Sequence, residues 1–304
     1  MRTIERIGIV GAGTMGRRIA FACVIHGKQT RIFDISHSVG QEAIRNVRQS
    51  IEEYARNGQL SRDALGSAMP LFSLSPTLAE CVSGTDAVIE AVPENVTLKR
   101  KVLSEIDAYC AVETIMGSNS SAIPGSWLAD STRRPQKLFN ANFGLLDDLK
   151  VEVMGHPNTS VETLESAIAF IRDIGLVPIL VRRENVGYSL NRIWRAVKKE
   201  VLYQLEHGHA TAEDIDRGWM LDWHTSVGPC GLMDQIGLDV VRDIEMIYFQ
   251  ASGDALDHPP SFLDRMIGAG MLGLKSGQGF YSYPKPEYQR PGWLDEGKNP
   301  STAA

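Results

Sequence analysis

The chain has 304 residues, 43% hydrophobic and 22% charged, which is ordinary for a globular protein long enough for two domains. Its net charge is −6 without any basic run, so nucleic acid is not an expected partner. No apolar stretch reaches the ~20 residues that span a bilayer, no secretory signal layout precedes the first strand, and the four scattered cysteines lack metal-ligand spacing. We therefore expect a cytoplasmic protein with no membrane association and no metal.

The first predicted strand leads into a glycine-rich turn. In the stretch from Arg6 to Gly16, a buried strand with Ile9 and Val10 runs into GAGTMG (11–16) at the start of a predicted helix. Gly11 permits a tight turn, Gly13 lets the backbone approach a pyrophosphate, and Gly16 lets helix and strand pack closely. The phosphates would lie against the free N–H groups and the positive dipole of the helix N-terminus. This pattern predicts a dinucleotide site.

A second predicted strand, Thr30–Phe33, ends at Asp34, close to the spacing expected for a carboxylate that binds the adenosine ribose. The pairing favours NAD(H) over NADP(H), because Asp34 would repel a 2′-phosphate. Arg31 lies before the core of the strand and not after Asp34, which makes it a poor phosphate ligand. The alternative is a glycine turn in an unrelated α/β protein that carries an aspartate on its surface.

Strands and helices alternate through the rest of the first half, which predicts an α/β Rossmann-like domain with a mostly parallel, doubly wound sheet. A second helical stretch follows Ser61, and the helix before it has broad polar faces that suit a projecting element. The remaining expected elements are helix 39–57, strand 86–92, helix 98–109, strand 114–117, strands 137–143 and 150–154, helix 161–174 and strand 177–181.

No strand-like run remains after Asn185, so we expect an all-α second domain and place the boundary between 1–184 and 185–304. Glycines and prolines, Gly237 among them, mark breaks between helices. The tail after Pro284 is rich in Pro, Lys and Glu, and we expect it to be loose. The predicted helices are 189–207, 211–220, 233–251 and 260–269.

Three polar clusters fall at or near the ends of predicted strands: Glu94-Asn95, residues 118–121 and residues 140–142. Ligands of open α/β sheets bind outside the carboxyl ends of the strands. We therefore expect the active site at these strand ends, in the cleft between the two halves of the chain.

The chain as a whole resembles the 3-hydroxyacyl-CoA dehydrogenase family, and the match covers nearly all of it. The landmarks together are far more specific than the glycine turn alone. They are GAGTMG (11–16), Asp34, IEAVPENVTLK (89–99), SNSSAIP (118–124), KVEV (150–153), VGYSLNR (186–192), ATAEDIDRG (210–218), VGPCGLMDQIGLD (227–239) and GLKSGQGFY (273–281).

The resemblance implies oxidation of a β-hydroxyl to a β-ketone with NAD on a small-molecule substrate, and a helical C-terminal domain that forms a homodimer. Lys99 and Lys275 have an alternative reading as solvated charges. The implied nucleotide-binding positions are Gly11, Gly13, Thr14, Met15, Gly16, Asp34, Glu94, Lys99, Asn119 and Lys275.

Three catalytic positions also follow from the resemblance. Ser121 resembles the serine that hydrogen-bonds the reacting oxygen, Glu152 the carboxylate that orients the catalytic base, and Asn191 the asparagine of the helical domain that completes the site. A hydroxyl and an amide can hold a developing alkoxide, and a buried carboxylate can fix an imidazole tautomer. The alternatives are a helix cap after Ala122 for Ser121, a solvated carboxylate for Glu152 and an ordinary surface position for Asn191.

The catalytic base breaks the pattern. The family carries a histidine within a His-Phe-Phe-Asn-Pro run, and counting without gaps from Ser121 places Asn142 there; the Asn-Pro pair is also absent, at Leu145-Leu146. An amide can hydrogen-bond but cannot take the proton of an alcohol. General acid–base catalysis is typically worth about 10²- to 10⁴-fold, so a shortfall of that size is expected.

Three explanations of Asn142 stay open. The base could be elsewhere in a divergent enzyme, the chain could be a binding protein that has lost turnover, or Asn142 could be an engineered substitution that traps a complex. His156 follows Glu152 closely, but it lies beyond the strand and fits a turn residue better.

The expected coenzyme A site departs from the family as well. Its serine is present as Ser50, but the lysine-rich stretch is replaced by residues 51–59, with Asn57 where a lysine is expected. Glu52 and Glu53 would repel phosphate, and only Arg56 and Arg62 could compensate.

We therefore favour an NAD-dependent dehydrogenase acting on a small free β-hydroxy or β-keto acid, or a related hydroxy or aldehyde compound. Arg192 is one candidate cation for a substrate carboxylate, although an ion pair within the helical domain suits it better. The alternatives are a 3-hydroxyacyl-CoA dehydrogenase proper and a nucleotide-binding dimer without turnover.

Overall fold

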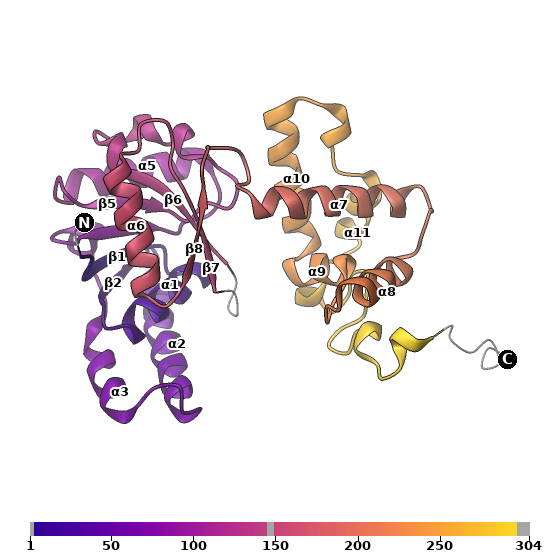
Figure 1. Cartoon of the computed structure of the whole chain (residues 1–304), viewed down its shortest axis with the longest axis horizontal. Helices are drawn as coiled ribbons and strands as arrows, with labels where there is room; N and C mark the ends of the chain where they lie inside the picture. The colour runs from indigo at the N-terminus through magenta and orange to yellow at the C-terminus, as the bar shows by residue number, and fades with distance from the viewer. Residues whose placement is uncertain (1–2, 145–148, 297–304) are drawn as a thin grey trace. The chain divides into compact units, whose positions relative to one another are not determined.

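The computed structural model describes residues 3–144 and 149–296. The chain divides into two compact units, Met1–Ser189 and Leu190–Ala304 (Figure 1). The boundary expected after residue 184 falls in the segment that joins the last strand to the first helix of the second unit. Throughout the described ranges, none of the helices combines the length and apolarity that a bilayer crossing needs.

The first unit is built on an eight-stranded sheet in the order β3-β2-β1-β4-β5-β6-β7-β8. The pairs from β3 to β6 are parallel, β7 runs antiparallel to β6, and β8 is parallel to β7. This confirms the predicted doubly wound, mostly parallel sheet. The strands are β1 Arg6–Val10, β2 Gln29–Phe33, β3 Phe72–Leu74, β4 Ala87–Glu90, β5 Ile115–Ser118, β6 Leu138–Phe143, β7 Lys150–Met154 and β8 Val177–Val181.

Helices cover both faces of the sheet. Successive strand residues point to opposite faces, so neighbours in one strand belong to different cores. Ile89 of β4 joins a core cluster with α1 (Thr14–Ile25), α2 (His37–Arg56) and α6 (Val161–Asp173). Its neighbour Val88 joins a second cluster with α4 (Leu78–Val82) and α5 (Val96–Tyr109). The near-continuous apolar runs of the central strands follow from this double burial.

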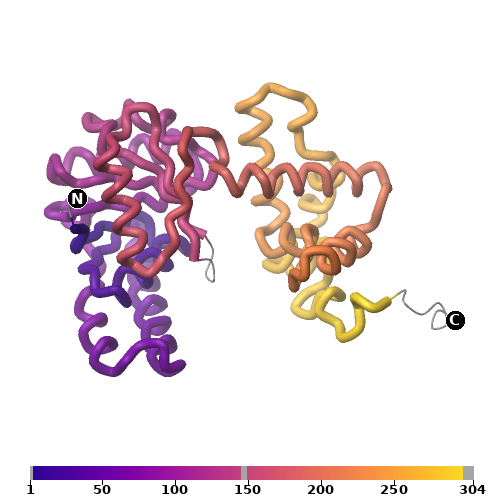
Figure 2. Tube along the Cα trace, viewed as in Figure 1, coloured from indigo at the N-terminus to yellow at the C-terminus, as the bar shows by residue number. Residues whose placement is uncertain are grey.

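Strand β3 was not predicted from the sequence, because its three residues are too few to show the apolar alternation of a strand. It is held at the sheet edge by its pairing with β2. The chain reaches β3 through α2 and α3 (Arg62–Ala68), which extend from the sheet as a helical pair (Figures 1 and 2).

The other edge strand, β8, carries a proline at its second position. The N–H of Val177 donates to the carbonyl of Leu149 at 2.7 Å, so it points toward β7. Backbone directions alternate along a strand, so the missing N–H of Pro178 falls on the outer side of the sheet. There it removes no hydrogen bond of the ladder.

The second unit is helical, as predicted, but one of its expected helices is divided. The single helix expected over 233–251 is wrong, because Gly237 has a φ of +101° and separates α9 from α10. A positive φ cannot continue a right-handed helix. The helices are α7 Leu190–Glu206, α8 Ala212–Trp223, α9 Pro229–Ile236, α10 Leu238–Ser252 and α11 Ser261–Gly268.

The expectation of a loose tail after Pro284 is also wrong as far as Glu296. Tyr288 and Trp293 lie in two short 3₁₀ turns and are buried in the core of the helical unit. Two large aromatic side chains outweigh the polar composition around them, because apolar burial scales with the area removed from water.

Candidate active site

The glycine turn has the geometry that a dinucleotide requires. Gly11 has a φ of +108°, and a Cβ there would lie 2.5 Å from the carbonyl oxygen of Ala91. A Cβ on Gly16 would lie 1.9 Å from the carbonyl oxygen of Gly11, whereas a Cβ on Gly13 would meet no atom of the described part of the chain within 4 Å. Two glycines are therefore required by contacts within the protein, and the third leaves the backbone open.

The N-terminus of α1 follows this open backbone. Thr14 and Met15 form its first turn, and Gly13 at the N-cap supplies no side-chain hydrogen bond. Backbone N–H groups there suit a pyrophosphate.

Asp34 lies just beyond β2 with both carboxylate oxygens fixed by the backbone. Oδ2 accepts from the N–H of Ala12 and Oδ1 from the N–H of Ser36, each at 2.9 Å. The ribose-binding carboxylate expected from the sequence is thus bonded directly to the glycine turn. Arg31 donates to backbone carbonyl groups of Glu80 and Ser83.

A buried ion pair lies beneath the end of β4. Glu90 and Lys99 are fully buried and join through Oε1 and Nζ at 2.8 Å, and the Ser118 hydroxyl donates to the other oxygen of Glu90 at 2.6 Å. The solvated alternative for Lys99 is therefore wrong, and its nucleotide contact stays a prediction. Sequence reasoning missed Glu90; a glutamate inside an apolar strand with a lysine nine residues later was the available signal.

Glu94 organises the loop after β5. Its Oε1 accepts from the Ser120 hydroxyl at 2.5 Å and from the N–H groups of Ser121, Ala122 and Ile123 at 3.0, 2.9 and 3.3 Å. Successive N–H groups that converge on one anion form a backbone nest. The predicted contact of Glu94 with the nucleotide stays a prediction, while its observed contacts hold the segment that carries Ser121.

Asn119 and Ser120 fix the same loop from within. The Oδ1 of Asn119 accepts from the N–H of Phe143 at 3.0 Å, which joins the ends of β5 and β6. The Ser120 hydroxyl accepts from the N–H of Ile123 at 2.7 Å. Ser121 has an exposed side chain, and no α-helix starts after Ala122, so its alternative as a helix cap is wrong.

Asn142 and Glu152 face each other across the antiparallel pair of β6 and β7. The Nδ2 of Asn142 donates to Oε2 of Glu152 at 3.3 Å, and Oε1 accepts from the N–H of Ser189 at 3.0 Å. Glu152 is only 1% exposed, so its solvated alternative is wrong. The residues Leu145-Leu146, where the Asn-Pro pair is missing, lie outside the described residues.

His156 does not replace the missing base. Its Nε2 lies 2.8 Å from the carbonyl oxygen of Pro135, and its Nδ1 accepts from the N–H of Asn158 at 3.3 Å. A carbonyl can only accept, so the ring is the neutral tautomer with the proton on Nε2. The ring is buried in a turn after β7, with both nitrogens engaged.

Two predicted residues belong to the helical unit. Asn191 is the second residue of α7 and is half-buried. Lys275 is an exposed charge that forms an ion pair with Asp239 at 2.5 Å within that unit. The roles of Asn191 toward substrate and of Lys275 toward nucleotide stay predictions.

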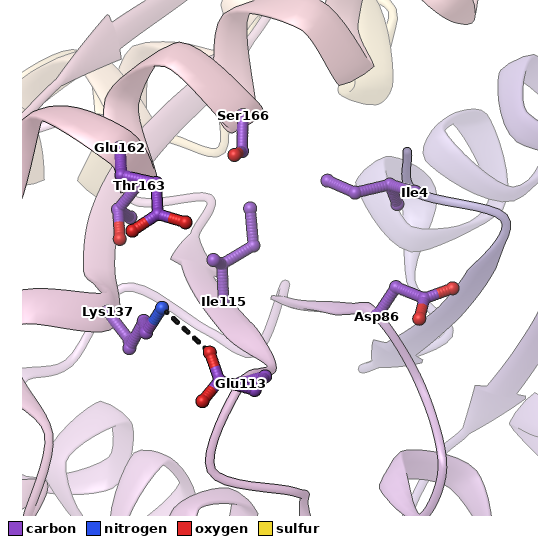
Figure 3. Close-up of a pocket in the computed structure, with 8 residues that line it drawn as sticks. All are labelled: Ile4, Asp86, Glu113, Ile115, Lys137, Glu162, Thr163 and Ser166. Carbon is purple, nitrogen blue, oxygen red and sulfur yellow. Dashed lines mark hydrogen bonds and ion pairs between the residues drawn. The ribbon is translucent and has the colours of Figure 1, made fainter. Parts of the chain in front are cut away.

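A hollow at the amino ends of the strands is unrelated to this site (Figure 3). None of the predicted site residues lines it, and Lys137 at its wall pairs with Glu113 at 3.3 Å. Its lining residues are Ile4, Asp86, Glu113, Ile115, Lys137, Glu162, Thr163 and Ser166.

Each of the two units matches a model of a known protein family. The family model described as "3-hydroxyacyl-CoA dehydrogenase, NAD binding domain" matches residues 6–185, and the one described as "3-hydroxyacyl-CoA dehydrogenase, C-terminal domain" matches residues 187–283. The chain is 31% identical over 282 residues to a probable 3-hydroxybutyryl-CoA dehydrogenase of Bacillus subtilis (strain 168), covering 92% of this chain and 98% of that protein.

Solved structures agree. (S)-3-Hydroxybutyryl-CoA dehydrogenase PaaH1 from Ralstonia eutropha has a TM-score of 0.87 at 33% identity, covering 93% of this chain and 100% of that one. A 5-formyl-3-hydroxy-2-methylpyridine 4-carboxylic acid 5-dehydrogenase, described as an NAD⁺-dependent dismutase, has a TM-score of 0.74 at 27% identity, covering 96% and 93%. The chain therefore belongs to the 3-hydroxyacyl-CoA dehydrogenase family and is an NAD-dependent oxidoreductase that acts on CH–OH groups.

Proposed function

We propose that this chain interconverts a β-hydroxy and a β-keto carbonyl compound, or a related hydroxy and aldehyde compound, and that its substrate is a small free carboxylic acid. The contact between Asn142 and Glu152 carries the proposal. Glu152, which we propose as the carboxylate that orients a catalytic base, is buried and bonded to Asn142, which we propose to stand at the base position.

The site residues divide the work as follows. Ser121 and Asn142 hold the substrate oxygen, and Glu152 orients Asn142 from behind. The family resemblance gives Asn191 the same role. NAD supplies the hydride acceptor when it is bound. The Nδ2 of Asn142 donates to Glu152, and its amide oxygen can accept a hydrogen bond from a substrate hydroxyl. The amide cannot take the proton of that hydroxyl. Turnover is therefore slow with asparagine at this position.

The surface of α2 favours a free acid over an acyl-CoA. At the end of α2 where the family carries lysines, Arg56 is ion-paired with Glu53 at 3.6 Å, and the exposed Arg45 and Arg48 lie further back on the helix. Glu52 is exposed beside Arg56, and Asn57 stands where the family has a lysine. This surface offers little attraction to a nucleotide 3′-phosphate. The related 4-carboxylic acid dehydrogenase is named for a free acid, which supports the same assignment.

The first prediction concerns Asn142→His. We expect the substitution to raise the rate of NADH oxidation by about two orders of magnitude, because imidazole can carry the proton and Glu152 is already in place to orient it. The measurement is NADH absorbance with acetoacetyl-CoA and with a panel of free β-keto and aldehyde acids. Asn142→Gln, which keeps an amide, is the matched control.

The substrate panel also decides between the alternatives. Faster turnover of acetoacetyl-CoA than of every free acid would assign a 3-hydroxyacyl-CoA dehydrogenase proper. Equal rates for the parent and Asn142→His would contradict the catalytic assignment. NADH binding without consumption by either protein would favour the second candidate, a nucleotide-binding dimer without turnover, which Asn142 itself motivates.

The second prediction is that the chain is a homodimer formed by its helical unit, as the family resemblance implies. Trp223 of α8 is 67% exposed, and its ring lies 5.7 Å from that of Trp219. Contiguous exposed apolar patches mark interaction surfaces, and we expect this pair of rings to form part of one. Light scattering should give twice the chain mass of 33.4 kDa, and Trp223→Ser should lower it. A concentration-independent monomer would refute the dimer. We also propose that the protein is located in the cytoplasm.

A further inference from the structure

Residues 184–189, here called the strap, connect β8 to α7 and bond to two separate parts of the candidate site. On one side, Glu184 accepts from the N–H of Ser126 at 2.7 Å, and the N–H of Gly187 donates to the carbonyl of Ala122 at 3.3 Å. On the other side, the N–H of Ser189 donates to Glu152 at 3.0 Å. The strap therefore sets the loop after β5 in register with the carboxylate on β7.

Tyr188 is the buried centre of the strap. It is fully buried beside Met154 and Val181, and its hydroxyl donates to the carbonyl of Ser120 at 2.7 Å. Its φ of +57° is in the left-handed region, where a bulky side chain is uncommon. Such a conformation persists only where surrounding contacts determine it, and here the ring packing and the hydroxyl bond do so together.

The peptide group between Ser120 and Ser121 is held at both of its ends. Its carbonyl accepts from the Tyr188 hydroxyl at 2.7 Å, and its N–H donates to Glu94 at 3.0 Å. A peptide group is planar and rigid, so two opposed hydrogen bonds fix the plane. The plane in turn fixes the direction in which the Ser121 side chain leaves the backbone.

We propose that Tyr188 is a positioning residue that fixes Ser121 relative to Glu152 through the carbonyl of Ser120. The assignment rests on the proposed function, in which Ser121 holds the substrate oxygen. Tyr188 acts through the backbone and does not touch the reacting atoms.

The hydroxyl serves as a permanent donor. Burial, and after it the nearby Glu94 carboxylate, raise the pKa of Tyr188 well above its ordinary value. The phenol therefore keeps its proton throughout the working range, and the bond to Ser120 does not titrate.

The test compares Tyr188→Phe with Tyr281→Phe. Both changes remove one buried phenol hydroxyl; that of Tyr281 bonds Asp216 at 3.0 Å in the core of the helical unit and serves as the matched control. Hydrogen exchange of the full-length chain is followed by mass spectrometry over the peptide 118–126. We expect faster exchange of that peptide in Tyr188→Phe and unchanged exchange there in Tyr281→Phe.

The kinetic arm uses the Asn142→His background. We expect Tyr188→Phe to lower kcat by about tenfold or more, because a small misplacement of a positioned group is costly, with NADH affinity within about twofold. In a background that also carries Ser121→Ala, the same change should lower kcat no further, as a double-mutant cycle shows for two residues that act as one unit.

Each outcome decides the proposal. Unchanged exchange over 118–126 overturns it, and so does an equal loss of kcat with and without Ser121, which would mark a merely structural role. If NADH binds but neither the parent nor Asn142→His turns over any substrate, the proposed function fails. The exchange result then still decides whether Tyr188 holds the loop.

Discussion

The buried ion pair of Lys99 and Glu90 lies beneath the candidate site. The third prediction concerns the loss of its lysine. Among the residues that the structure describes, Lys99→Met leaves the buried Glu90 with only the Ser118 hydroxyl and the N–H of Val92 as partners. Removing one member of a buried ion pair costs about 3–5 kcal/mol, so urea unfolding should show a loss of that size.

The control is the double variant in which Glu90→Gln accompanies Lys99→Met. Replacing both charges removes the uncompensated carboxylate, so most of the lost stability should return. A double variant as unstable as Lys99→Met alone would mean that packing, and not charge, is the cause.

At this scale, the sequence indicated residues whose chemistry is local. The glycines of the turn and Asp34 are recognisable because their spacing along the chain is itself the signal. The role of Tyr188 was not recognisable, because it depends on a partner that the fold brings close; the bond from Tyr188 to Ser120 spans 68 residues. The apolar residues around a polar residue in the sequence do not indicate which distant residue will be its hydrogen-bond partner.

Among the elements, the turn between β1 and α1 gives the fourth prediction. Gly16→Ala would place a methyl group 1.9 Å from the carbonyl oxygen of Gly11, so helix and strand must separate. Overpacking of this kind costs typically about 1–3 kcal/mol or more, and NADH binding should be lost with it. Thermal unfolding and tryptophan quenching by NADH measure the two effects.

Gly13→Ala separates stability from binding. Its Cβ would meet no atom of residues 3–144 or 149–296 within 4 Å, so the melting temperature should hardly change. The added methyl still stands where the pyrophosphate must approach, and NADH affinity should fall. Equal melting losses in Gly13→Ala and Gly16→Ala would contradict the distinction.

Long, strongly patterned elements were predictable, and short or interrupted ones were not. The apolar runs of β1 and β4 show double burial directly, whereas β3 has only three residues and is held by its pairing. The error over 233–251 arose because helical periodicity continues across Gly237, while the positive φ of that residue breaks the helix. Periodicity reports which residues are buried and does not report where the axis turns.

For the molecule as a whole, acid stability gives the fifth prediction. Burial raises the pKa of Asp107, but hydrogen bonds from Arg133 and Arg134 outweigh it and lower the pKa below 3.8. A carboxylate with a depressed folded pKa stabilises the fold above its unfolded pKa, and this stability is lost as pH falls through the folded pKa. Asp107→Asn should therefore lower the urea midpoint at pH 7 and flatten its decline below about pH 4.

Asp222→Asn is the control, because Asp222 is exposed on α8 and surface substitutions usually change stability by less than about 0.5 kcal/mol. A decline with acid as steep in Asp107→Asn as in the parent would place the acid sensitivity in other carboxylates.

The two-unit organisation follows from composition and pattern, because alternating strands and helices give way to helices alone. The arrangement of the tail was not predictable in this way. Tyr288 and Trp293 are buried although polar residues surround them in sequence, and only the folded helical core supplies the cavity that receives them.

The proline in β8 has a consequence for the association of this protein with other chains at high concentration. An edge strand is a template on which another chain can add itself, and repeated addition leads to polymer growth. Here the template lacks one amide at Pro178, on the side where a newcomer would have to bond, while the inner ladder to β7 is complete. At the opposite edge, β3 is too short to seed such growth. The sheet is thus self-terminating at both edges, and its size is set within the chain.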